Sequence, residues 1–187
     1  NCFDDFSEAA KWLIKGQITS PSKLAIMGGS NGGLLVAATM EQHPDLFGAV
    51  ICQVPVTDML RYQKFTIGSK LKNEYGNVDE DASYFKYLFS YSPVHNVKKW
   101  KKYPPILVTT GENDDRVPPL HSYKFIAALQ AIDDGEKPKL LRVESEAGHG
   151  GGKPLSKTIE EQTDIYAFLF NVLGMTFKDA DSLKSKP

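Results

Sequence analysis

The sequence has little of what would mark a secreted or membrane protein. Its 187 residues include two cysteines, Cys2 and Cys52, too few for a disulfide framework and typical of free thiols in a reducing compartment. No apolar run approaches the roughly 18 residues that span a bilayer, and residues 1–4 lack the character of a signal peptide. An initiator methionine is also missing. We therefore expect a cytoplasmic location, no membrane partner and a natural N-terminus upstream of Asn1.

An excess of one charge is absent as well. The chain carries 22 basic and 23 acidic residues, a net charge of −1, which gives no reason to expect nucleic acid as a partner. The run KKWKK at 98–102 could form a binding patch, but we interpret it as a solvated charge run before a strand. The hydrophobic content of 41% is that of an ordinary globular protein with one core.

The apolar pattern predicts alternating strands and helices. Short, continuously apolar strands, each followed by a helix, indicate a parallel sheet that is covered on both faces, in an α/β architecture. On such a sheet the functional residues lie at the carboxyl ends of the strands. We expect one domain over residues 1–175 and a polar tail over 176–187. The predicted strands are 23–28, 49–53, 105–110 and 140–144, and the predicted helices are 3–14, 34–42, 60–65, 82–89, 120–132 and 158–173.

The pentapeptide GGSNG, centred on Ser30, fits the G-x-S-x-G nucleophile elbow. A serine on a sharp strand-to-helix turn has a strained backbone, so we expect Gly28 and Gly32 to provide space and Gly33 to let the helix pack closely. The N–H of Asn31 is then an oxyanion donor at the positive end of the helix. A phosphate-binding glycine loop is the alternative, but the preceding strand and following apolar helix favour the elbow.

A serine nucleophile needs a base and an orienting acid, which follow it in the order Asp, His in α/β hydrolases. Two adjacent candidates, Asp114 and Asp115, follow the strand at 105–110, and composition does not separate them. His149 follows the strand at 140–144 and is flanked by glycines, which suits a loop that must bend toward the nucleophile.

The three other histidines, His43, His95 and His121, are interpreted as structural or surface residues. None of them has metal-ligand spacing with a cysteine or carboxylate, so we expect no metal. We expect no cofactor either.

Four separate blocks of the sequence are GGSNGGLLVAA, HPDLFGAVICQVPVTDML, NDDRVPPLHSYKF and EAGHGGGKP. Together they resemble the catalytic domain of the prolyl oligopeptidase (S9) family. The resemblance covers about residues 20–172, and asparagine after the nucleophile points to the prolyl oligopeptidase branch rather than to dipeptidyl peptidases. It implies an α/β-hydrolase fold and a serine endopeptidase that cleaves short peptides after proline through an acyl-enzyme.

The resemblance also assigns roles to residues. It makes Ser30 the nucleophile, His149 the general base and acid, and Asp114, rather than its neighbour, the orienting carboxylate. Arg116 matches an arginine that holds a substrate carbonyl, a task suited to a guanidinium group. The positions that match the pocket for the residue before the cleaved bond are Asn31, Val56, Tyr75 and Val117.

Two departures from the family pattern stand out. Leu71 occupies the position of a tryptophan that stacks on the proline ring, which weakens the expected proline preference. The chain also lacks the family's N-terminal β-propeller and the first strands of the hydrolase fold, including a tyrosine that supplies the second oxyanion donor. The alternatives are an esterase or lipase on the same fold, or an inert interaction module.

Overall fold

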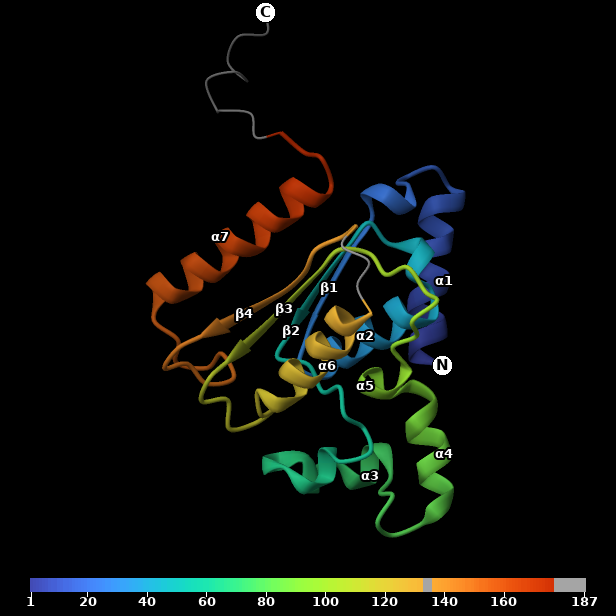
Figure 1. Ribbon diagram of the computed structural model, residues 1–187, viewed down its shortest axis with the longest axis vertical. Helices are drawn as coiled ribbons and strands as arrows, with labels where there is room; N and C mark the ends of the chain where they lie inside the picture. The colour runs from blue at the N-terminus through green and yellow to red at the C-terminus, as the bar shows by residue number, and fades with distance from the viewer. Residues whose placement is uncertain (133–135, 177–187) are drawn as a thin grey trace, which may run out of the picture.

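The computed structural model describes residues 1–132 and 136–176, and its frame is a four-stranded parallel sheet (Figure 1). The strands lie in the order of the chain, and each pairs in parallel with the next. The predicted strands are thus confirmed to within about two residues at each end. They are β1 (Ala25–Gly29), β2 (Ala49–Gln53), β3 (Ile106–Gly111) and β4 (Lys139–Glu144).

Helices cover the two faces of the sheet. Figure 1 shows α7 on one face and α2 with α6 on the other. The helices are α1 (Cys2–Lys15), α2 (Asn31–Gln42), α3 (Lys72–Tyr75), α4 (Ala82–Tyr91), α5 (Pro93–Asn96), α6 (Leu120–Ala131) and α7 (Leu155–Val172). None of the helices in the described ranges is long and apolar enough to cross a membrane. Of the predicted polar tail, residues 177–187 lie outside the described residues.

The side chains of β2 alternate between the two layers. Val50 and Cys52 belong to the cluster with α2 and α6, whereas Ala49 and Ile51 pack with Ile165 of α7. Because both faces are covered, this strand reads as an uninterrupted apolar run. β1 pairs only with β2 in the described sheet, and its Met27 is 54% exposed.

The helix predicted over 60–65 is wrong. The segment instead forms two short 3₁₀ helices, Tyr62–Lys64 and Thr66–Leu71. Tyr62 is buried and its hydroxyl donates to the Gly76 carbonyl at 2.5 Å. Thr66 has a positive φ of 41°, which an α-helix does not allow. The chain therefore folds back on itself here and forms one wall of a cavity.

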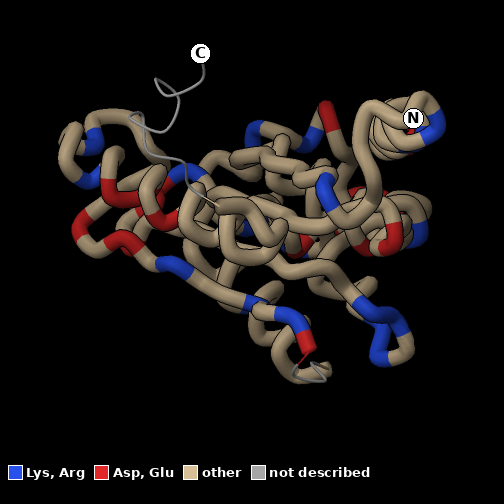
Figure 2. Tube along the Cα trace, turned by 90° about the horizontal axis from the view of Figure 1, so that it is seen from above, with Lys and Arg blue, Asp and Glu red and all other residues tan. Residues whose placement is uncertain are grey.

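Charged residues of both signs are distributed around the molecule (Figure 2). In the KKWKK run, Lys101 Nζ donates to the Glu41 carbonyl at 2.6 Å, and Lys102 pairs with Glu136 at 3.0 Å. Two of the four lysines in this run therefore have partners within the protein.

Candidate active site

Ser30 occupies the turn between β1 and α2, with φ 58° and ψ −117°, a conformation that costs energy for any residue with a side chain. A Cβ on Gly28 would lie 2.2 Å from the Gly32 carbonyl oxygen, and one on Gly33 would lie 2.7 Å from Pro55. Glycine is therefore required at both positions. The expectation that Gly32 also provides space is wrong, because a Cβ built there would have no described atom within 4 Å apart from its chain neighbours and the backbone of its own helix.

The loops after β3 and β4 bring Asp114 and His149 together. Oδ2 of Asp114 lies 2.7 Å from Nδ1 of His149, and Oδ1 accepts the backbone N–H groups of Arg116 and Val117, each at 2.9 Å. The Asp114 side chain is fully buried, whereas Asp115 is exposed. A carboxylate placed in this way keeps the proton on Nδ1, which leaves Nε2 able to accept a proton.

Gly111, at the end of β3, allows this approach. A Cβ there would lie 2.5 Å from the carbonyl oxygens of Ala147 and Gly148, so the loop that carries the histidine passes directly over the glycine. Within the described ranges, no hydrogen bond joins the Ser30 hydroxyl to His149, and that hydroxyl does not cap α2. Serine, aspartate and histidine all follow carboxyl ends of strands, as the sequence order predicts.

A cavity of about 50 Å³ opens beside Ser30. The hydroxyl of Tyr75 donates to Asn31 Oδ1 at 2.7 Å, and burial raises the pKa of this tyrosine, so it remains a neutral donor. Within the described part of the chain, the exposed guanidinium of Arg116 makes no ion pair. The predicted residues that line the cavity are Ser30, Asn31, Val56, Leu71, Tyr75, Arg116 and Val117.

Sequence reasoning missed part of the cavity wall. His121 is 2% exposed, and its Nδ1 accepts the N–H groups of Thr57 at 3.2 Å and Asp58 at 3.0 Å. Burial lowers the pKa of His121 to about 4, so the ring is neutral near pH 7. Two of the missed positions, Pro118 and His121, lie in the block NDDRVPPLHSYKF without an assigned role, and no motif in the sequence analysis marks the other four. The missed residues are Tyr62, Phe65, Ile67, Gly68, Pro118 and His121.

A buried carboxylate lies behind His121. Burial alone would raise the pKa of Asp58, but the hydrogen bond from Lys124 at 2.8 Å and the nearby positive charges lower it on balance. Arg61 Nη1 lies 3.3 Å from the same carboxylate. The pair with Lys124 joins the segment after β2 to α6.

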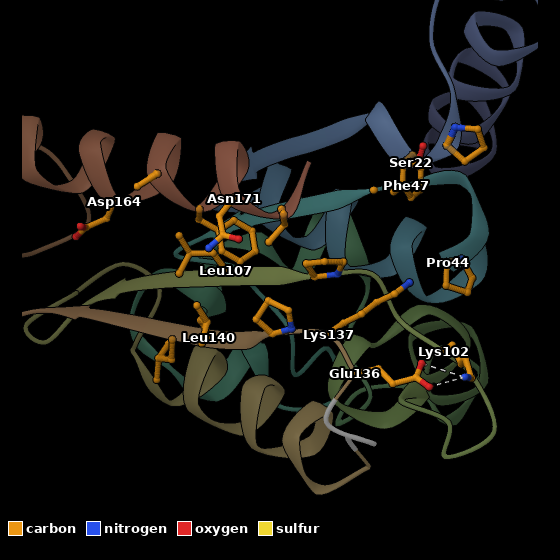
Figure 3. A pocket seen from close by; sticks show the side chains of 18 of the residues that line it. Ser22, Pro44, Phe47, Lys102, Leu107, Glu136, Lys137, Leu140, Asp164 and Asn171 are labelled. Carbon is orange, nitrogen blue, oxygen red and sulfur yellow. Dashed lines mark hydrogen bonds and ion pairs between the residues drawn. The ribbon is translucent and has the colours of Figure 1, made fainter. Parts of the chain in front are cut away.

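A much larger groove, about 1160 Å³, lies elsewhere (Figure 3). Phe47, Pro105 and Pro138 line it, and they precede β2, β3 and β4. It therefore lies at the amino ends of the strands and contains none of the predicted site residues. Because ligands of parallel sheets bind at the carboxyl ends, we place the active site at the small cavity beside Ser30.

A parallel α/β sheet with a serine in a strained strand-to-helix turn, followed along the chain by an Asp–His pair, defines an α/β hydrolase. Comparison with known proteins narrows this class. The model of the prolyl oligopeptidase family matches residues 1–176, and the chain belongs to this family.

Individual relatives agree with this family assignment. A prolyl endopeptidase of Dictyostelium discoideum is 50% identical over 94% of this chain and 23% of its own length. Prolyl oligopeptidase A of Galerina marginata is 43% identical over 96% of this chain and 24% of its own. A solved prolyl endopeptidase structure superposes with a TM-score of 0.89 at 48% identity, over 93% of this chain and 26% of its own. The chain thus spans about a quarter of the length of these relatives.

Proposed function

We propose that these residues form the catalytic part of a serine endopeptidase that cleaves short peptides on the carboxyl side of proline. Ser30 is the nucleophile, His149 the general base and acid, and Asp114 the orienting carboxylate. The observation that carries the proposal is the 2.7 Å contact between Asp114 and His149, at the same sheet edge as the strained serine. The names of the relatives support a peptidase rather than an esterase or lipase.

In this mechanism the Ser30 hydroxyl attacks the carbonyl carbon of the peptide, and His149 Nε2 takes the hydroxyl proton. The buried carboxylate of Asp114 stabilises the imidazolium that results. The N–H of Asn31, the first residue of α2, donates to the oxyanion at the positive end of the helix. His149 then protonates the leaving amine, and water hydrolyses the acyl-enzyme by the reverse sequence of proton transfers.

The residues that line the cavity beside Ser30 indicate how a peptide substrate would bind. Val56, Leu71 and Val117 offer an apolar lining for the side chain before the cleaved bond, and Tyr75 fixes the Asn31 side chain at its rim. The exposed guanidinium of Arg116 is available to donate to a substrate carbonyl.

We further propose that residues 1–175 belong to the catalytic domain of a larger enzyme that contains a propeller and further hydrolase strands. The coverage of about a quarter of the relatives supports this. The free thiols of Cys2 and Cys52 support a cytoplasmic location.

A fluorophosphonate probe tests the nucleophile in the complete protein. It should label Ser30, and Ser30→Ala should abolish both labelling and peptide hydrolysis, with kcat reduced by about 10⁴–10⁶ because triad members act as a unit. Ser90→Ala, on the exposed side of α4, is the matched control and should behave like the parent. Labelling of another serine, or turnover by Ser30→Ala, would contradict the proposal; an unlabelled, inactive parent would favour the inert module.

A further inference from the structure

The cavity beside Ser30 has an aromatic side that no motif identified. Phe65 and His121 both line it and meet edge to face, with ring centroids 5.9 Å apart and an interplanar angle of 82°. This is a favoured geometry, because the positive edge of one ring meets the negative face of the other. Phe65 is thus the more accessible ring in the cavity wall that Ser30 also lines, and the buried His121 packs against it.

The His121 ring is held firmly. Its Nδ1 accepts the backbone N–H groups of Thr57 and Asp58, and its carbonyl oxygen accepts the Thr57 hydroxyl at 2.7 Å. Rotation of the ring would leave two buried N–H groups without a partner, which is costly. His121 is therefore a rigid support within the cavity wall.

Phe65 lacks a polar anchor of its own. It lies between the 3₁₀ helices Tyr62–Lys64 and Thr66–Leu71, and the adjacent Thr66 hydroxyl donates to the Arg116 carbonyl at 2.5 Å. This bond ties the segment to the loop after β3 but leaves the phenyl ring to be positioned by packing. The ring that it packs against edge to face is His121.

We propose that Phe65 is a specificity-determining residue and that His121 is its positioning residue, holding the phenyl ring where the side chain before the cleaved bond binds. The inference rests on the peptidase function proposed above and names the side of the pocket that recognises the substrate. A flat aromatic surface matches the compact ring of proline, whereas the methyl group of alanine leaves most of that surface uncovered.

Matched peptides that differ only in proline or alanine before the cleaved bond test this in the complete protein. Phe65→Leu keeps an apolar side chain but removes the ring, and should lower the proline-to-alanine ratio of kcat/KM by about threefold to tenfold, mainly through KM. His121→Asn keeps an acceptor for the two N–H groups and should act in the same direction. The double variant should lose no more than Phe65→Leu alone. Phe85→Leu and His43→Asn, outside the cavity, should leave the ratio unchanged.

The rate at which a small fluorophosphonate labels Ser30 reports the fold and the nucleophile without using the pocket. It should stay within about twofold of the parent in every variant. A normally labelled Phe65→Leu protein with an unchanged ratio, or additive losses in the double variant, would overturn the inference while the proposed function stands. A parent that is labelled but cleaves neither peptide would overturn the proposed function, and this inference with it.

Discussion

At the scale of single residues, Asp114 and Asp115 have the same chemistry, yet the fold gives them opposite surroundings. The Asp114 side chain is fully buried and accepts from two backbone N–H groups and the His149 ring. Asp115 is exposed. The buried carboxylate of Asp114 keeps all of its hydrogen bonds in one orientation only, whereas water can solvate the exposed carboxylate of Asp115 in any orientation.

We therefore expect Asp114→Asn to lower kcat by about 10⁴, because an amide can stabilise the wrong histidine tautomer. Asp115→Asn, which leaves the buried contacts intact, should change kcat by less than about threefold. Peptide hydrolysis by the two variants at pH 7 is the measurement. Equal losses would show that Asp115 also acts on His149, in conflict with the geometry.

The sequence could identify the residues whose signals are local. Ser30 follows from its glycine neighbours, and His149 from chain order and flanking glycines. His121 and Phe65 could not be found in this way. Burial keeps His121 neutral, and its ring accepts N–H groups of Thr57 and Asp58, more than sixty positions earlier in the chain, which only the fold brings close.

At the scale of elements, strands and helices with continuous apolar runs were predictable, because burial on both faces leaves a clear pattern. The helix predicted over 60–65 failed for a tertiary reason. Tyr62 turns inward to reach the Gly76 carbonyl, and a Cβ on Gly68 would fall 1.9 Å from the Tyr62 carbonyl oxygen. Neither contact has a signature within the segment itself.

The elbow between β1 and α2 yields a matched pair of glycine variants. Gly28→Ala places a Cβ 2.2 Å from backbone, so we expect a loss of about 1–3 kcal/mol in unfolding free energy and much lower activity. Gly32→Ala enters open space within α2 and should be neutral or stabilise by about 0.5–1 kcal/mol. Chemical denaturation and Ser30 labelling rates measure both; equal destabilisation by the two variants would refute this account of the elbow.

At the scale of the whole molecule, the neutral His121 links stability to pH. Its pKa is about 4 in the folded protein, mainly through burial, and 6.5 when unperturbed. Between these values the unfolded chain binds a proton that the native protein does not, so the unfolding free energy falls as pH drops from 6.5 toward 4. The loss should reach roughly 3 kcal/mol.

Urea titrations at several pH values from 7 to 4 measure this loss. His121→Asn cannot titrate and should flatten the curve in that window, while His43→Asn, at the end of α2, should not. Equal changes in stability between pH 6.5 and 4.5 for the parent and His121→Asn would mean that His121 is not held neutral in the native protein.

The edge of the sheet at β1 bears on whether these 187 residues would self-associate as an isolated polypeptide. In the described sheet β1 pairs on one side only, and Met27 is 54% exposed on it. On α7, Ile159 and Tyr166 are each 56% exposed. An exposed, apolar strand edge is a template for pairing with another chain. The free energy of unfolding is only about 5–15 kcal/mol for typical domains. Apolar faces that stay exposed contribute nothing to it, so we expect the isolated polypeptide to be only marginally stable.

We expect the isolated polypeptide to associate in size-exclusion chromatography. It should also hydrolyse peptides at least 10²-fold more slowly than the complete protein, whose proposed further strands would supply the second oxyanion donor. One such donor is worth about 10²–10³ in rate. Met27→Lys places a charge on the edge of β1 and should shift the elution toward the monomer without restoring hydrolysis. Leu155→Lys, at an equally apolar but helical position that is 75% exposed, controls for added charge alone and should shift it less. A monomeric polypeptide with ordinary turnover would show that the fold is functionally complete with β1 at its edge.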